Sequence, residues 1–188
     1  MRSRKTSYAS FACLFFLALS AWAATYRRMS LDELVQSSDY VIYGRVIESH
    51  VQWDPTTRTI WTRTELLVLD GPKGEAETSI AVTEPGGILD GHGELYPGVP
   101  QFHPGEEVVL FLYRAPGNRL RVTGSLQGVY PVVMDRQTGE RLAQPAAPHR
   151  EVVYEEGSRY AQKAAPLTAG AEKLSSFLYL IRQKALMR

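Results

Sequence analysis

Residues 40–53, YVIYGRVIESHVQW, are the stretch that most directly indicates the fold. β-Branched and aromatic residues are frequent in it, as they are in strands. Alternate positions place Ile42 and Val46 on one side and Tyr43 and Arg45 on the other. A period of two is the spacing of a strand with two different faces, so this stretch is predicted to be a strand.

Similar patterns recur along the chain, separated by residues that favour turns. Residues 59–69, TIWTRTELLVL, alternate in the same way over a greater length. Shorter strand patterns occupy 77–85, 106–114, 119–124 and 128–135. Several short strands with turn signals between them predict a small barrel or sandwich.

Helical patterns occur only near the two ends of the predicted mature chain. Ser30 and Glu33 have the spacing of a capping box, which predicts a short N-terminal helix. Leu174, Phe177 and Ile181 recur at helical spacing near the C-terminus. We expect this second helix to pack on the barrel, and docking on a membrane surface or on a partner is the alternative.

The first 23 residues have the pattern of a secretory signal peptide, with Arg2, Arg4 and Lys5 before a short apolar run and small residues at its end. The run is shorter than a membrane span, so we expect no transmembrane segment after cleavage. Cys13 is the only cysteine and would leave with the peptide. The mature protein is therefore expected to be exported, to the periplasm or the extracellular space, without disulfides or thiolate metal ligands.

The charge balance argues against a nucleic-acid partner. The chain has 21 Lys and Arg and 20 Asp and Glu, so the mature protein, without its three basic leader residues, is slightly acidic. At roughly 165 residues, one core is expected. We assign residues 24–135 to the barrel, 136–166 to an extended linker or tail and 167–188 to the C-terminal helix. The oligomeric state is left open.

The order of these motifs resembles that of a group of uncharacterised exported bacterial proteins. The shared features are an SD-V-xx-G-x-V first strand, an I-x-T second strand ending in KG, a Pro-Gly-Gly after the third, and P-x-F-xx-G-E-x-V-L-F-L around the fourth. They fall here on Ser38, Asp39, Val41, Gly44, Val46, Ile60, Thr62, Lys73, Gly74, Pro85, Gly86, Gly87, Pro100, Phe102, Gly105, Glu106, Val109, Leu110, Phe111 and Leu112. The resemblance covers about residues 30–135.

The same strand order is similar to the netrin-like modules of the tissue inhibitors of metalloproteinases. That resemblance implies a mainly β, OB-like barrel of five to six strands with a helix at each end. It does not carry over the inhibitory mechanism, which uses an N-terminal cysteine that this mature chain is not expected to have.

The outward side of the strands is the first candidate ligand-binding surface, because OB-like barrels bind extended ligands on such a face. Alternation predicts that it mixes aromatic residues with arginines. Its members are Tyr43, Arg45, Trp61, Arg63, Arg119 and Arg121. The alternative is that a terminal helix or the tail covers the aromatics and that acids such as Glu65 pair with the arginines.

The glycine-rich stretch at 84–113 is the second candidate. It contains Asp90, His92, Glu94 and His103, whose oxygen and imidazole groups are possible metal ligands. Their spacing matches no helical zinc motif and no calcium loop, so the simpler interpretation is a solvated loop shaped by glycine and proline.

No nucleophile elbow or acid and base pair is recognisable, and we expect no cofactor. The sequence therefore favours an exported, non-catalytic module that binds a protein, a peptide or an envelope polymer, either through the outward face of the strands or through the loop from Gly86 to Phe102. Two alternatives remain: a metal-binding protein or metal-assisted hydrolase using residues 84–113, and an envelope assembly protein that docks through its C-terminal helix.

Overall fold

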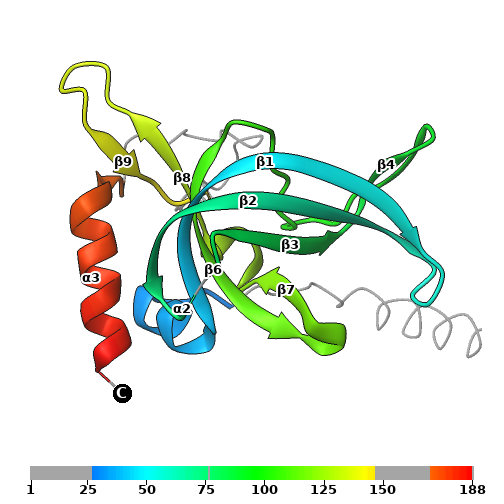
Figure 1. Cartoon of the computed structure of the whole chain (residues 1–188), viewed down its shortest axis with the longest axis horizontal. Helices are drawn as coiled ribbons and strands as arrows, with labels where there is room; N and C mark the ends of the chain where they lie inside the picture. Colours follow the sequence, from blue (N-terminus) through cyan, green and yellow to red (C-terminus); the bar gives the residue numbers. More distant parts are fainter. Residues whose placement is uncertain (1–26, 76, 147–169, 188) are drawn as a thin grey trace, which may run out of the picture.

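Five strands close into a ring in the computed structural model, which describes residues 27–75, 77–146 and 170–187 (Figure 1). They are β1 (Tyr40–Asp54), β2 (Thr59–Lys73), β3 (Ser79–Pro85), β6 (Glu107–Ala115) and β7 (Arg119–Val122). Their order is β1-β2-β3-β7-β6, and β6 pairs again with β1. Only β3 and β7 are parallel among these pairs. The structure thus confirms the expected mainly β, OB-like barrel.

The other described strands extend this ring. β8 (Val129–Met134) pairs with β6, β9 (Arg141–Ala143) with β8, and β10 (Glu172–Lys173) with β9. β4 (Gly87–Leu89) and β5 (His92–Glu94) form a separate hairpin. Two short 3-10 helices, Pro116–Asn118 and Ser125–Gly128, flank β7.

Two of the expected segments lie wholly or mostly outside the described residues. The predicted signal peptide, residues 1–23, is one of them. The predicted linker, 136–166, is described up to residue 146, and there it forms β9 rather than continuing as an extended connection.

The N-terminal helix, α2 (Leu31–Ser37), begins where the capping box predicted it. Ser30 Oγ accepts a hydrogen bond from Glu33 N at 3.2 Å, and the Glu33 carboxylate accepts one from Ser30 N at 2.8 Å. These two bonds satisfy backbone donors that the first turn of a helix leaves unpaired.

The protein has one apolar core inside the barrel and another outside it. The inner core is formed by inward residues of the strands together with Phe102 of the loop before β6: Ile42, Val46, Leu66, Ile80, Val82, Phe102, Val108, Leu110, Leu112, Val122 and Val129. The outer core lies where α2 and α3 (Leu174–Leu186) cover β1 and β6: Leu34, Val35, Val41, Tyr43, Val109, Phe111, Ala143, Leu174, Phe177, Leu178 and Ile181. Since both faces of β1 and β6 are buried, their sequences are almost continuously apolar over this region.

The C-terminal helix packs on the barrel, as expected. Its apolar stripe is buried in the outer core, and ion pairs from Arg182 to Asp70 and from Lys184 to Asp32 flank it. Figure 1 shows α3 on one side of the barrel, with the far ends of β1 and β2 and the β4 hairpin projecting on the other. Within the described residues, no helix has the length and apolar character that crossing a membrane requires.

Candidate functional site

The structure separates the candidate ligand-binding residues into two places. Trp61, Arg63, Arg119 and Arg121 lie together on the outer side of β2 and β7, and we call this surface the Trp61 face. Tyr43 and Arg45 lie on β1, next to β6.

Tyr43 does not contribute to an open face. Its side chain points out of the barrel, as alternation predicted, but it is buried in the outer core beneath α3. Its hydroxyl donates to Glu107 Oε2 at 2.5 Å, and burial followed by this contact raises the pKa of Tyr43 to about 12. Arg45 donates to the same carboxylate at 2.6 Å. These two residues therefore do not share a face with Trp61, because Tyr43 is buried in the outer core and Arg45, whose side chain is 49% exposed, pairs with Glu107 beside β6.

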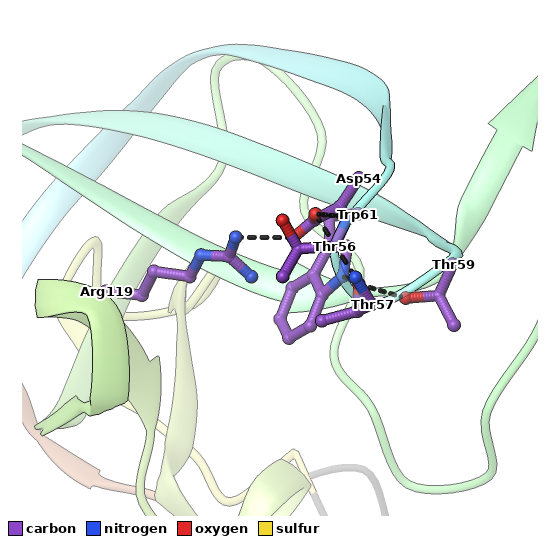
Figure 2. Close-up of polar contacts among 6 residues, drawn as sticks. All are labelled: Asp54, Thr56, Thr57, Thr59, Trp61 and Arg119. Atoms are coloured by element: carbon purple, nitrogen blue, oxygen red, sulfur yellow. Dashed lines mark hydrogen bonds and ion pairs between the residues drawn. The ribbon is translucent and has the colours of Figure 1, made fainter.

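Trp61 is the centre of the remaining cluster. Arg119 stacks over its ring with 4.6 Å between the guanidinium carbon and the ring centroid, and Arg121 does so at 5.6 Å. The indole Nε1 donates to Thr57 Oγ1 at 2.9 Å, which fixes the ring against the turn between β1 and β2. Figure 2 shows the ring between this turn and Arg119 of β7.

Asp54 connects the same turn to β7. Its carboxylate accepts hydrogen bonds from the backbone N–H of Thr56 at 2.8 Å and from Arg119 Nη2 at 2.5 Å (Figure 2). The Arg119 hydrogen bond, followed by that from Thr56, lowers the pKa of Asp54 to about 2. The single carboxylate of Asp54 thus links the turn between β1 and β2 to β7, on the opposite side of the ring.

Glu84 has an equivalent position between β3 and β7. These strands share the single register pair Val82 and Leu120, so the ladder is short. Beyond it, Glu84 Oε1 accepts from the backbone N–H of Val122 at 2.6 Å, and Oε2 accepts from Arg121 at 2.9 Å. Only 7% of the Glu84 side chain is exposed, and burial raises its pKa. The Glu84 carboxylate thus takes the place of a backbone hydrogen bond between β3 and β7, where the ladder between them is short.

Arg63 completes the pattern by donating to Glu65 at 2.5 Å. Each arginine of the Trp61 face therefore has a carboxylate partner within the chain. This pairing of acids with arginines is the alternative that the sequence left open for the outward face. The contacts of the cluster hold β2, β3 and β7 together.

A pocket of about 400 Å³ lies among the end of β1, the start of β2 and the β4–β5 hairpin, and we call it the barrel mouth. Figure 1 shows these parts of the strands on the side of the barrel away from α3. The walls of the pocket are the inward residues of β1 to β3, including Ser49, Val51, Thr64 and Val82. Its rim is the β4–β5 hairpin together with the loop that follows, residues 95–103. The glycine-rich stretch is therefore more than a solvated loop, because it forms one side of a cavity.

The rim of the barrel mouth carries large apolar side chains in contact with solvent. Ile88 is 68% exposed, Leu95 is 72% exposed and Tyr96 is 41% exposed. Trp53, on the same side of β1 as Val51, is 50% exposed. A concave apolar site with a few polar groups at its base is the usual form of a binding pocket, and exposed apolar residues around it mark an interaction surface.

Glycine is required where the rim approaches the strands. Gly87 has a φ of 132°, and a Cβ there would lie 2.6 Å from Thr62 Oγ1 and 2.8 Å from Val51 Cγ1. Gly86 also has positive φ, at 101°. Both glycines thus adopt a backbone geometry that other residues rarely take, and the tight packing holds the hairpin close to β1 and β2.

The candidate metal ligands do not form a metal site. Glu94 accepts hydrogen bonds from Ile60 N at 3.1 Å and Tyr96 Oη at 3.1 Å. His103 pairs with Glu106, and Asp90 and His92 lie in and after the hairpin turn. Within the described ranges, no three His, Cys, Asp or Glu residues are placed to hold a metal ion. The metal hypothesis for Asp90, His92, Glu94 and His103 is not supported by this geometry.

Sequence reasoning named the loop from Gly86 to Phe102, which contains Leu95 and Tyr96, as a possible binding surface, but it missed Ser49 and Val51 of β1. A signal was present on the strands: the inward positions include the hydroxyl residues Ser49, Thr62 and Thr64 in the halves of β1 and β2 that lie next to their connecting turn. Hydroxyl groups at inward positions indicate that the interior opens to solvent there.

Comparison with models of known protein families and with curated proteins found no match to this chain.

Proposed function

We propose that this protein is an exported binding module, rather than an enzyme, and that it recognises a peptide segment of a protein at the barrel mouth. The observation that carries the proposal is the pocket of about 400 Å³ with exposed apolar residues on its rim. Peptide ligands are held by this combination of a pocket for one side chain and an apolar margin for its neighbours.

The resemblance to netrin-like modules implies an OB-like barrel, and barrels of this kind commonly bind extended ligands. The signal-like leader implies a location in the periplasm or outside the cell. An envelope polymer would be the alternative ligand if the Trp61 face were the binding surface. We favour the barrel mouth because the arginines of the Trp61 face already have carboxylate partners.

The charge of the pocket indicates the chemistry of the peptide. The lining includes the carboxylates of Glu94 and of Glu84, the latter already paired with Arg121, and it includes no lysine or arginine. Asp90 and Glu106 lie in the adjoining loops. The preferred peptide is therefore expected to combine apolar residues with a lysine or arginine.

Selection from a random library of displayed twelve-residue peptides against mature protein (residues 24–188) tests the proposal. We expect peptides whose affinity falls about tenfold or more in the double variant Ile88→Ser, Leu95→Ser. The matched control is Met134→Ser, Tyr179→Ser, which removes similarly exposed apolar groups on β8 and α3. A selection that yields no peptide able to distinguish the two variants would contradict the proposal.

A further inference from the structure

The far half of β1 has one unpaired edge beside the barrel mouth. β1 pairs with β2 over almost its whole length, but with β6 only from Tyr40 to Arg45. The last backbone contacts on the β6 side are at Val46, whose N–H donates to Glu106 O and whose carbonyl accepts from Gly105 N, both at 2.9 Å. From Ile47 onward, no strand of the described chain pairs with this edge.

The edge is exposed because the chain turns away before β6 begins. Gly105 has a φ of 89°, and Glu106 N donates to His103 O at 3.1 Å across a tight turn. A shift in the register between Val46 and Glu48 marks a bulge at the same point of β1. Bulges bend a strand and end its pairing with a neighbour, so β1 continues with β2 alone.

The direction of the unpaired backbone groups follows from the register. Ile60 accepts from Gly86 N at 2.7 Å, so its backbone groups face away from β1. Pro85, which has no N–H, lies opposite Trp61. By the same alternation the backbone groups of Trp61 point toward β1, so no hydrogen bond from Pro85 is required. The backbone groups of Trp53 and Val51, which lie opposite Ile60 and Thr62, must then point away from β2.

Ser49, opposite Thr64, follows the same rule, so Ser49, Val51 and Trp53 all direct N–H and C=O groups to the free edge. Ser49 and Val51 also line the pocket with their side chains. Across the pocket, residues 100–103 approach this edge, and Ser49 Oγ donates to Phe102 O at 3.4 Å. The unpaired backbone groups and the pocket thus belong to one continuous surface.

We infer that the ligand of the barrel mouth is an extended peptide that adds to β1 as a further strand at Ser49, Val51 and Trp53. This inference rests on the proposed function and specifies its binding mode. Strand addition takes its affinity from backbone hydrogen bonds and its specificity from pockets for alternate side chains. One apolar side chain enters the pocket, and a lysine or arginine lies toward the acidic rim formed by Glu94 and its neighbours.

Amide hydrogen exchange on the mature protein, with and without a selected peptide, tests the inference. In the free protein, His50 and Gln52, which face β2, should exchange slowly, while Ser49, Val51 and Trp53 should exchange rapidly. Peptide binding should slow the second group about tenfold or more. Unchanged exchange at these residues, with binding still sensitive to Ile88→Ser and Leu95→Ser, would overturn strand addition but leave the proposed function intact.

Two further results separate the possible occupants and binding modes. Protection of the edge in the absence of peptide, together with a concentration-dependent dimer, would show that a second copy occupies it and would overturn the inference. Val51→Pro removes only an edge-facing N–H from the backbone, a change that edge strands tolerate. It should weaken peptide binding about tenfold more than Val51→Ala, and equal affinities of the two variants would count against backbone pairing.

Discussion

The Trp61 face and the barrel mouth share strand β2, but their side chains differ in whether they have partners within the chain. On the Trp61 face, Arg119 and Arg121 are held by Asp54 and Glu84, whose side chains are only 8% and 7% exposed. At the barrel mouth, apolar side chains such as Leu95 remain in solvent around an open pocket.

The comparison shows that a conspicuous set of residues does not by itself identify a binding surface. Aromatic residues and arginines are frequent at interfaces, and they made the Trp61 face attractive in the sequence. Their partners within the chain assign them to holding the ring of strands closed. The residues left without such partners are the apolar ones on the rim.

Glu84→Ala should produce the largest loss of stability, and it tests whether the ion pairs of the Trp61 face hold the ring of strands closed. The variant leaves the Val122 N–H and the Arg121 guanidinium without their buried partner, so we expect a loss of about 3–5 kcal/mol in the free energy of unfolding. Urea unfolding followed by circular dichroism measures it. Glu84→Gln is the control, because its amide oxygen still accepts from Val122, and a loss as large as that of alanine would contradict the role assigned to the carboxylate.

Trp61→Ala should have the next largest effect on stability. It removes a half-buried ring and its stacking on Arg119 and Arg121, so a loss of about 1–3 kcal/mol is expected in the same unfolding experiment. Trp61→Phe retains a ring for the arginines and should lose less. Peptide affinity at the barrel mouth should stay near the wild-type value, and a large decrease in a folded variant would show that the Trp61 face takes part in binding.

The double variant Ile88→Ser, Leu95→Ser should show the opposite pattern. Because both side chains are largely exposed, the unfolding free energy should change by less than about 1 kcal/mol. The affinity for a selected peptide should nevertheless fall by about 1.4 kcal/mol or more, which is tenfold in the dissociation constant. Fluorescence anisotropy of a labelled peptide gives the affinity. A marked loss of stability instead would mean that these residues belong to the core.

A smaller effect is expected from acid titration of Asp54. Its pKa in the folded protein is about 2, below the ordinary value of 3.8, so the folded state binds this proton less readily than the unfolded state. The stabilisation is therefore present above about pH 4 and is lost as the pH falls toward about 2. The stability difference between the wild type and Asp54→Asn should shrink over this interval, and a difference independent of pH would contradict the ion pair with Arg119.

Local patterns predicted most of the ring but little of the barrel mouth. The alternation in β1 and β2 and the capping box at Ser30 depend on neighbours in sequence, and the structure bears them out. The covering of Tyr43 by α3 depends on packing between segments more than a hundred residues apart, which no local period encodes. The pocket likewise combines Ser49 of β1 with a loop some fifty residues later in the chain.

The mature chain offers a direct comparison of the two regions, because Trp53 and Trp61 are the only tryptophans outside the predicted signal peptide. Each indole N–H gives its own NMR signal, one at the free edge of β1 and one inside the Trp61 face. Titration with a selected peptide should shift the Trp53 signal and leave the Trp61 signal in place. A shift confined to Trp61 would contradict the assignment of binding to the barrel mouth.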